Sequence, residues 1–194
     1  MDLWIEENTS HIVNQKPDEC YESTCVSFED DLYVFGGCKS EKLGRNYTFF
    51  NDVFKYNITT NIWSLIPWNR TKGVKPKPRS SHSSVIYDKK MYVFGGTTNQ
   101  VDVLSDFFSF DFTTQTWKEI ITVDKEEISG RYGHSSDIYN DSMIVYGGYK
   151  NTTENDIWIY YFIEKNWKKI TISSENKEIP ETTQYQTMSK KKKK

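Results

Sequence analysis

Three stretches of the sequence decide the fold: DLYVFGG (residues 31–37), KMYVFGG (90–96) and SMIVYGG (142–148). They repeat one short pattern, and their glycine doublets begin 59 and then 52 residues apart. Self-similarity at a fixed period indicates that one supersecondary unit stacks against copies of itself. We therefore interpret the chain of 194 residues as three repeats of one unit.

The similarity extends to both sides of the doublets. Downstream, an aromatic residue precedes a tryptophan by seven positions in every copy: Tyr56 and Trp63, Phe110 and Trp117, Tyr160 and Trp167. Upstream, the second and third copies place an arginine sixteen residues and a histidine thirteen residues before the first glycine: Arg79 and His82, Arg131 and His134. Cys20 and Ser23 occupy those positions in the first copy. The first repeat thus keeps the apolar frame but lacks the basic pair.

The composition predicts a soluble globular chain with an aromatic core. The formal net charge is −2, hydrophobic residues make up 36% of the chain, and aromatic residues make up 15%. No apolar run approaches the roughly 18 residues of a membrane span, so we expect no membrane partner. The acidic first residues lack the apolar segment of a secretory signal, which favours a cytoplasmic protein. In a reducing compartment Cys20, Cys25 and Cys38 are expected to be free thiols.

Charge is distributed unevenly along the chain. Five of the 25 basic residues form the run 190–194, which leaves 20 basic residues against 27 acidic ones in the remainder. Residues 171–194 are polar and lack periodicity, so we expect a disordered tail.

Each repeat divides into four segments of strand character. These segments are rich in β-branched and aromatic residues and are bounded by turn residues, and in the second repeat they are 83–87, 91–94, 107–112 and 116–120. Four antiparallel strands recurring every fifty or so residues are typical of a propeller blade. The glycines permit a close backbone approach at the end of the second strand, and the large aromatic residues are expected to fill the space between blades.

The repeats resemble kelch motifs. The resemblance rests on the R-x-x-H-S segment, on the spaced aromatic–Trp pair and on the doublets Gly36, Gly37, Gly95, Gly96, Gly147 and Gly148. It covers roughly residues 20–170, and a WD40 interpretation is weaker because the sequence contains no Trp-Asp dipeptide. The resemblance implies an all-β, kelch-type β-propeller, with four-stranded antiparallel blades at approximately residues 20–66, 79–121 and 131–170.

Three blades make an incomplete propeller. Kelch propellers close with about six blades, whereas this chain offers three, preceded by a single strand-like segment at residues 3–5 within a domain of residues 1–170. An open propeller would expose the apolar faces of its end blades, which implies association or instability. Three explanations stay open: a fragment of a longer protein, a truncated copy, or a subunit that completes a ring as a homodimer.

Loop lengths predict which face binds a partner. One face carries only tight turns, whereas the other carries long loops at residues 38–51, 64–78, 97–105 and 122–130. Long exposed loops on a rigid scaffold are the usual place for recognition. The loop of residues 69–79 carries Arg70, Lys72, Lys75 and Lys77 without an acidic residue, so it is a candidate for binding an acidic partner segment, the alternative being an ordinary solvated loop. Nucleic acid is not favoured, because the chain outside its lysine tail is acidic.

Two arginines at the entrance of the innermost strands are further candidates. In kelch adaptors resembling this chain, arginines at this place face a substrate peptide near the central channel, which implies partner contacts for Arg79 and Arg131. The alternative is a hydrogen bond that ties neighbouring blades together. A structural role is favoured for His82 and His134, because a residue that recurs once per blade is explained by the blade.

The sequence does not favour catalysis. Metal-dependent kelch-like enzymes need several convergent ligands, yet the chain contains only three histidines, and two of them occupy equivalent positions in neighbouring repeats. We therefore expect no metal, no cofactor and a non-catalytic protein-interaction module of the adaptor or scaffold type. The alternatives are a chain with no independent activity and, less favoured, an enzyme acting on a small carbohydrate.

Overall fold

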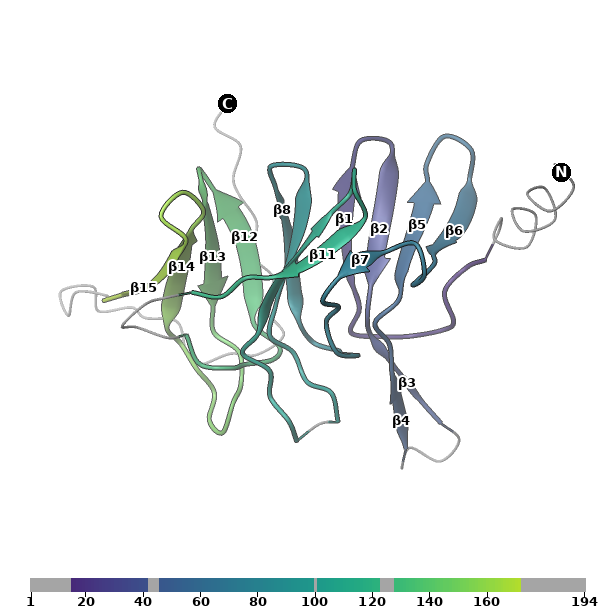
Figure 1. The fold of residues 1–194 in the computed structure, drawn as a ribbon. Helices are drawn as coiled ribbons and strands as arrows, with labels where there is room; N and C mark the ends of the chain where they lie inside the picture. Colours follow the sequence, from purple (N-terminus) through teal and green to yellow (C-terminus); the bar gives the residue numbers. More distant parts are fainter. Residues whose placement is uncertain (1–14, 42–45, 100, 123–127, 172–194) are drawn as a thin grey trace, which may run out of the picture.

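The structure is a computed structural model that describes residues 15–41, 46–99, 101–122 and 128–171. This part of the chain is all-β (Figure 1). Blade 1 contains β1 (Thr24–Phe28), β2 (Asp31–Phe35), β5 (Val53–Asn57) and β6 (Ile62–Ile66). Blade 2 contains β8 (Ser83–Tyr87), β9 (Lys90–Phe94), β10 (Phe107–Asp111) and β11 (Thr116–Glu119). Blade 3 contains β12 (Ser135–Tyr139), β13 (Ser142–Tyr146), β14 (Ile157–Tyr161) and β15 (Asn166–Ile170). The remaining strands are β3 (Cys38–Ser40), β4 (Tyr47–Phe49) and β7 (Lys72–Gly73).

The four strands of each blade follow one another in antiparallel order, as β1-β2-β5-β6 illustrates. The first two strands of blade 2 are joined by Asp88 and Lys89, whose φ angles are +44° and +58°. Positive φ at both positions is typical of two-residue hairpin turns whose backbone twist matches that of the flanking strands. All tight turns lie on the upper side of Figure 1, and the long connections lie on the lower side, where β3 and β4 form a projecting hairpin. We call the lower side the long-loop face.

The glycine doublets allow the next blade to pass close by. Gly95 and Gly96 have φ angles of +66° and +97°, and a Cβ atom on Gly95 would lie 2.5 Å from the carbonyl oxygen of Arg131 in the following repeat. A side chain at this point would push blade 3 away, so the doublet sets the spacing between blades.

The core lies between the blades. Phe35 of blade 1 packs against Trp117 of blade 2 with ring centroids 5.0 Å apart, and Phe94 of blade 2 packs against Trp167 of blade 3 at 5.2 Å. The repeated tryptophan therefore faces the preceding blade, where aromatic pairs contribute beyond the area they bury.

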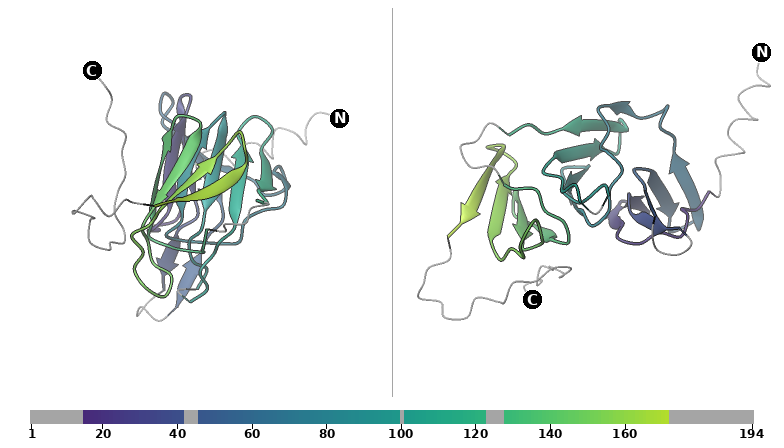
Figure 2. Two further views of the ribbon diagram at one scale, coloured as in Figure 1. Left: turned by 90° about the vertical axis from the view of Figure 1, so that its left-hand side faces the viewer. Right: turned by 90° about the horizontal axis from the view of Figure 1, so that it is seen from below.

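The propeller is open, as Figure 2 shows in the view from below, where three blades fan along an arc. The contrast between equivalent residues reveals the uncovered face. Phe108 and Trp117 of blade 2 are 4% and 1% exposed beneath blade 1, whereas Phe54 and Trp63 on the same face of blade 1 are only half-buried. The fold is thus an incomplete kelch-type propeller, as the repeats predict.

Two expectations lie outside the described residues. These are the strand-like segment at residues 3–5 and almost the whole of the polar tail. Within the described ranges, no helix is long and apolar enough to cross a membrane.

Candidate functional site

The two blade junctions repeat one set of backbone hydrogen bonds. At the first junction Gly37 N donates to Arg79 O (2.8 Å), Arg79 N to Phe50 O (2.9 Å) and Ser81 N to Glu22 O (3.0 Å). At the second, Gly96 N donates to Arg131 O (2.9 Å), Arg131 N to Leu104 O (3.2 Å) and Gly133 N to Ser81 O (2.9 Å). The segment that enters each innermost strand is therefore held against the preceding blade, which gives the long-loop face a rigid floor.

Arg79 lies inside the protein. Its side chain is 0% exposed, and its guanidinium donates to Gly95 O (3.0 Å) and to both carboxylate oxygens of Asp106 (2.6 and 2.8 Å). Arg131 is equally buried and donates to Gly147 O (3.0 Å) and Asp156 (2.6 Å).

This burial corrects the expectation that Arg79 and Arg131 contact a partner. A bidentate pair with a carboxylate occupies the fork of donors that a partner would need. The alternative expectation is a hydrogen bond that ties neighbouring blades together. The backbone of Arg79 makes such a bond, whereas its guanidinium ties strands of its own blade. Burial alone raises the pKa of Asp156, but hydrogen bonds from Arg131, Trp158 and Lys169 outweigh it and hold that pKa below its usual range.

The histidines join adjacent innermost strands. His82 Nε2 shares a hydrogen bond of 2.8 Å with Thr24 Oγ1, and His134 Nε2 shares one of 2.8 Å with Ser83 Oγ. Burial, reinforced by the positive charge of Arg79, lowers the pKa of His82 well below its ordinary value. Burial and Arg131 lower the pKa of His134 to about 3. Both imidazoles are therefore neutral at pH 7 and hold the blades together.

The other repeated residues also support the blades. The ring centroids of Tyr56 and Trp63, of Phe110 and Trp117, and of Tyr160 and Trp167 lie 4.9, 4.9 and 5.1 Å apart. All six doublet glycines have positive φ, namely Gly36, Gly37, Gly95, Gly96, Gly147 and Gly148.

The basic loop of residues 69–79 lies elsewhere than expected. Its Lys72 and Gly73 form β7, which pairs in parallel with β11 at the outer edge of blade 2, beside the blade instead of on the long-loop face (Figure 1). Arg70, Lys72 and Lys77 are exposed. Lys75 instead donates to Trp68 O (2.5 Å) and lies over the Trp68 ring at 4.1 Å. Lys72 is thus available at the outer edge, Lys77 lies beside the buried Arg79, which donates to its carbonyl oxygen, and Lys75 is engaged within the loop.

A hollow of about 300 Å³ opens on the long-loop face. We call it the long-loop hollow, and it is lined by Tyr21, Glu22, Cys38, Tyr47, Phe49, Ser80, Ser81, Thr97 and Tyr132. Isolated antiparallel bridges occur at equivalent places in successive blades: Tyr21 with Cys38, Ser80 with Thr97, and Tyr132 with Tyr149. All of these residues except Tyr149 line the hollow. One backbone frame therefore presents three different pairs of side chains.

The chemistry of the long-loop hollow suits hydrogen bonding. The carboxylate of Glu22 accepts hydrogen bonds from Ser80 Oγ (2.8 Å) and Ser81 Oγ, and Glu22 itself is exposed. Thr97 is 4% exposed, and its Oγ1 has no hydrogen-bond partner among the described residues. Burial raises the pKa of the Cys38 thiol, so this sulfur is not a thiolate nucleophile at neutral pH. The hollow offers acceptors, hydroxyl groups and tyrosine rings to an incoming chain.

Reasoning from the sequence missed these residues, although a signal for them exists. The bridge residues Tyr21, Ser80 and Tyr132 directly follow the arginine position. Their partners Cys38, Thr97 and Tyr149 directly follow the glycine doublet, where all three residues differ between copies that otherwise agree. Blade packing requires similar residues in each copy, so differences at one structural position mark residues that the blade does not require.

Metal-ligand geometry gives no competing site. Across the described ranges, no group of three or more His, Cys, Asp or Glu side chains is arranged to hold a metal ion, and Cys20, Cys25 and Cys38 are free.

Comparison with known proteins agrees with this architecture. The chain is 32% identical over 162 residues to Kelch domain-containing protein 3 of Bos taurus, covering 76% of this chain and 39% of that protein. It is 25% identical over 189 residues to Kelch domain-containing protein 1 of Homo sapiens, covering 88% of this chain and 46% of that protein. The chain thus spans less than half the length of these curated relatives.

Structure and family comparison lead to the same conclusion. The solved structure of YjhT superimposes with a TM-score of 0.64 at 21% identity, covering 80% of this chain and 53% of that one, which supports the fold. The family model of the KLHDC2/KLHL20/DRC7 Kelch-repeats domain matches residues 4–194. The chain therefore belongs to the kelch-repeat family.

Proposed function

We propose that this chain is a non-catalytic protein-interaction module that binds a polypeptide segment in the long-loop hollow. The observation that carries the proposal is the row of three equivalent bridges whose side chains differ from blade to blade. A rigid frame with variable residues at one face is how repeat proteins build recognition surfaces.

The lining defines the chemistry of the partner. The Glu22 carboxylate suits donors such as backbone N–H groups, hydroxyl groups or a cationic side chain. Tyr21 and Tyr132 supply rings with polar tips, which are enriched at protein interfaces. The exposed Lys72 at the outer edge of blade 2, with Arg70 two residues before it, offers a separate contact for an acidic segment. A cytoplasmic adaptor or scaffold role is part of this proposal.

The state of the reactive side chains supports a binding role. A general base works best with a pKa near the operating pH, whereas the pKa of His134 is lowered to about 3 and its Nε2 atom is engaged with Ser83. His82 is held in the same way by Thr24. Both imidazoles serve the blade junctions instead of a substrate.

The half-buried outer face of blade 1 favours a second candidate, a chain that has no independent activity until its propeller is completed. Phe54 and Trp63 are the residues that a covering blade would bury. Light scattering coupled to size exclusion tests it on the full chain. A sharp dimer would indicate two halves that complete one ring, whereas a monomer that unfolds without cooperativity would indicate that further blades are required.

A display selection tests the binding proposal. Random peptides are selected on the immobilised chain, and the selected peptides are then titrated against a variant carrying both Tyr21→Ala and Tyr132→Ala. The matched control is Ile163→Ala, because Ile163 is 70% exposed in the tight turn between β14 and β15 on the opposite face. We expect the double variant to weaken binding about tenfold or more and the control to leave it unchanged. Peptides that bind all three proteins equally would refute the long-loop hollow as the site.

A further inference from the structure

The first repeat retains the binding partners of an arginine that it does not contain. Asp52, Gly36 and Phe54 of blade 1 occupy the positions of Asp106, Gly95 and Phe108 in blade 2. In blade 1 the position of Arg79 is occupied by Cys20.

Blade 2 shows what those partners do. Asp106 receives two hydrogen bonds from the guanidinium of Arg79, Gly95 O receives a third at 3.0 Å, and the Phe108 ring lies under it at 5.6 Å. Blade 3 repeats the arrangement, because Arg131 donates to Gly147 O at 3.0 Å and to Asp156 at 2.6 Å. The same carboxylate and carbonyl positions therefore hold a guanidinium in two independent copies.

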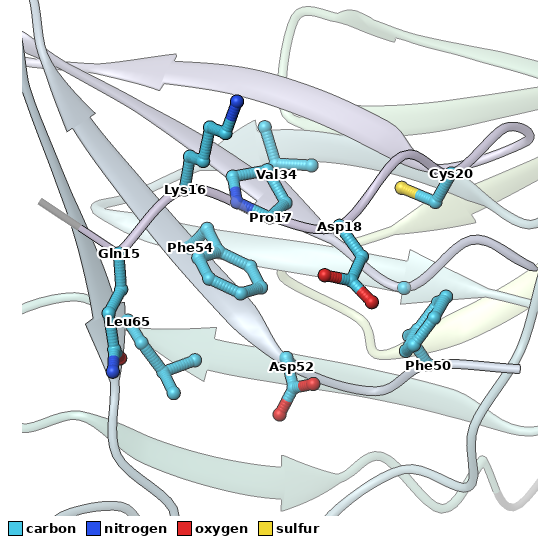
Figure 3. Close-up of a pocket in the computed structure, with 11 residues that line it drawn as sticks. Gln15, Lys16, Pro17, Asp18, Cys20, Val34, Phe50, Asp52, Phe54 and Leu65 are labelled. Atoms are coloured by element: carbon cyan, nitrogen blue, oxygen red, sulfur yellow. The ribbon is translucent and has the colours of Figure 1, made fainter. Parts of the chain in front are cut away.

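In blade 1 these groups line a hollow of about 340 Å³, which we call the first-blade hollow (Figure 3). Its lining residues include Cys20, Gly36, Asp52 and Phe54. Asp18 adds a second carboxylate, whereas the amino group of Lys16 points away from Asp52 in Figure 3. Asp18 also pairs with Lys39 at 3.4 Å at the surface. The space that an arginine side chain fills in blades 2 and 3 is thus open in blade 1 and is lined by two carboxylates, of which Asp52 has no lysine partner among the described ion pairs.

The existing contact of Asp52 does not block a guanidinium. Asp52 Oδ1 accepts a hydrogen bond from Trp68 Nε1 at 2.7 Å. Asp156 accepts the same kind of indole bond, from Trp158 Nε1 at 2.7 Å, while it also binds Arg131. A single carboxylate can therefore accept hydrogen bonds from an indole and a guanidinium together. In Asp52, Oδ2 is the oxygen left to accept from a guanidinium.

The backbone around Cys20 has the register of the other repeats. Tyr21 bridges Cys38 in blade 1 as Ser80 bridges Thr97 in blade 2. A side chain at position 20 consequently starts from the place where the Arg79 side chain starts. The site in the first repeat is unfilled because the cysteine side chain is too short to reach into it.

We propose that the first-blade hollow binds a guanidinium group, supplied by an arginine side chain of a partner polypeptide. The planar fork of donors matches one carboxylate and one carbonyl, and the Phe54 ring offers the stacking face that guanidinium prefers over ammonium. The site lies on the face of blade 1 turned away from blade 2, so it is separate from the long-loop hollow and independent of the function proposed for it.

The test uses the full chain with N-acetyl-arginine amide as the probe and N-acetyl-citrulline amide as its uncharged counterpart. Titration followed by amide NMR should give saturable shifts around Gly36, Asp52 and Phe54 with the arginine probe, and at least tenfold weaker binding with the citrulline probe. Equal binding of both probes, or no shifts with either, would overturn the proposal.

Two substitutions at position 20 test the same site by filling the hollow with a side chain of the protein itself. Cys20→Arg should fill the hollow, raise the melting temperature and abolish binding of the arginine probe. Cys20→Met, which adds length without charge, should give neither the increase in melting temperature nor the full loss of binding. An unchanged affinity for the probe in Cys20→Arg, or the same behaviour in both variants, would contradict a guanidinium site.

Discussion

Arg79 and Asp106 are joined by two parallel hydrogen bonds, Nη1 to Oδ1 at 2.6 Å and Nη2 to Oδ2 at 2.8 Å, across 27 residues of sequence. Arg79 precedes β8, Asp106 precedes β10, and Gly95, which also accepts from Arg79, follows β9. One buried side chain thus ties together three strands at the long-loop end of blade 2. Ser80, which directly follows Arg79, lines the long-loop hollow, so this clamp lies next to that hollow.

Removing the guanidinium is expected to destabilise the protein strongly. Arg79→Met leaves the carboxylate of Asp106, whose side chain is 21% exposed, without its partner, so we predict a loss of about 3 kcal/mol in the free energy of unfolding. Lys39→Met is the control, because the side chains of Lys39 and Asp18 are 47% and 70% exposed and such surface pairs contribute less than about 1 kcal/mol. Urea denaturation measures both. Equal losses in the two variants would contradict a structural role for Arg79.

The two buried histidines predict a stability that decreases as the pH falls below about 6.5. The pKa of His134 is near 3 in the folded chain and near 6.5 in the unfolded one, so the unfolded chain binds more protons in this range and is favoured. Each such histidine contributes about 1 kcal/mol of lost stability between pH 6.5 and 5.5.

His134→Gln checks this prediction. Unfolding free energies measured across the same pH range should show about 1 kcal/mol less pH dependence in the variant than in the wild type. Carboxylates such as Asp156, whose pKa is held below its usual range, become protonated at lower pH. They therefore do not contribute to the difference in pH dependence between the variant and the wild type. An unchanged pH slope would mean that the imidazole is not buried in its neutral form.

The chain supplies a matched pair for the histidine–hydroxyl contact between blades. Ser83 Oγ bonds His134 Nε2 at 2.8 Å, whereas the equivalent Ser135 Oγ of blade 3 is buried without a hydrogen-bond partner among the described residues. We predict that Ser83→Ala lowers the unfolding free energy by about 1 to 3 kcal/mol, because it leaves a buried nitrogen unpaired. Ser135→Ala should be neutral. If both substitutions cost the same in thermal denaturation, the junction contact contributes nothing measurable.

Gly73 is predicted to be essential for the pairing of β7 with β11. Its φ angle is +84°, and a Cβ atom would lie 1.9 Å from the carbonyl oxygen of Trp117. Gly73→Ala should therefore displace β7 and expose the amide of Lys72, which donates to Gln115 O at 3.1 Å. Hydrogen exchange of that amide should become fast, whereas Val74→Ala at a neighbouring exposed position should leave it protected. Unchanged protection in Gly73→Ala would contradict this strand pairing.

Much of the fold is predictable because the repeats carry it. The glycine doublet, the aromatic residue and the tryptophan each recur at fixed spacing, and blade packing imposes that spacing. The strands of the second repeat illustrate this, since the segment 107–112 suggested by β propensity corresponds to β10 (Phe107–Asp111). The openness of the ring follows from the same count of repeats.

The candidate site is harder to predict from the sequence, because its contacts join residues that are distant in sequence. Arg131 looks like a surface cation until Asp156, 25 residues later, is placed beside it. Lys72 looks like part of a loop until its pairing with β11 is known. The long-loop hollow escaped notice because its residues are ordinary tyrosines, serines and threonines, which become distinctive only when equivalent bridges are aligned.

The most direct test of peptide binding in the long-loop hollow is a map of amide NMR shifts on the full chain, recorded with and without a peptide obtained from the display selection. We predict that the shifts cluster at Tyr21, Ser80, Thr97 and Tyr132 around the long-loop hollow. Shifts confined to the tight turns of the opposite face, residues 58–61, 112–115 and 162–165, would contradict the proposed site.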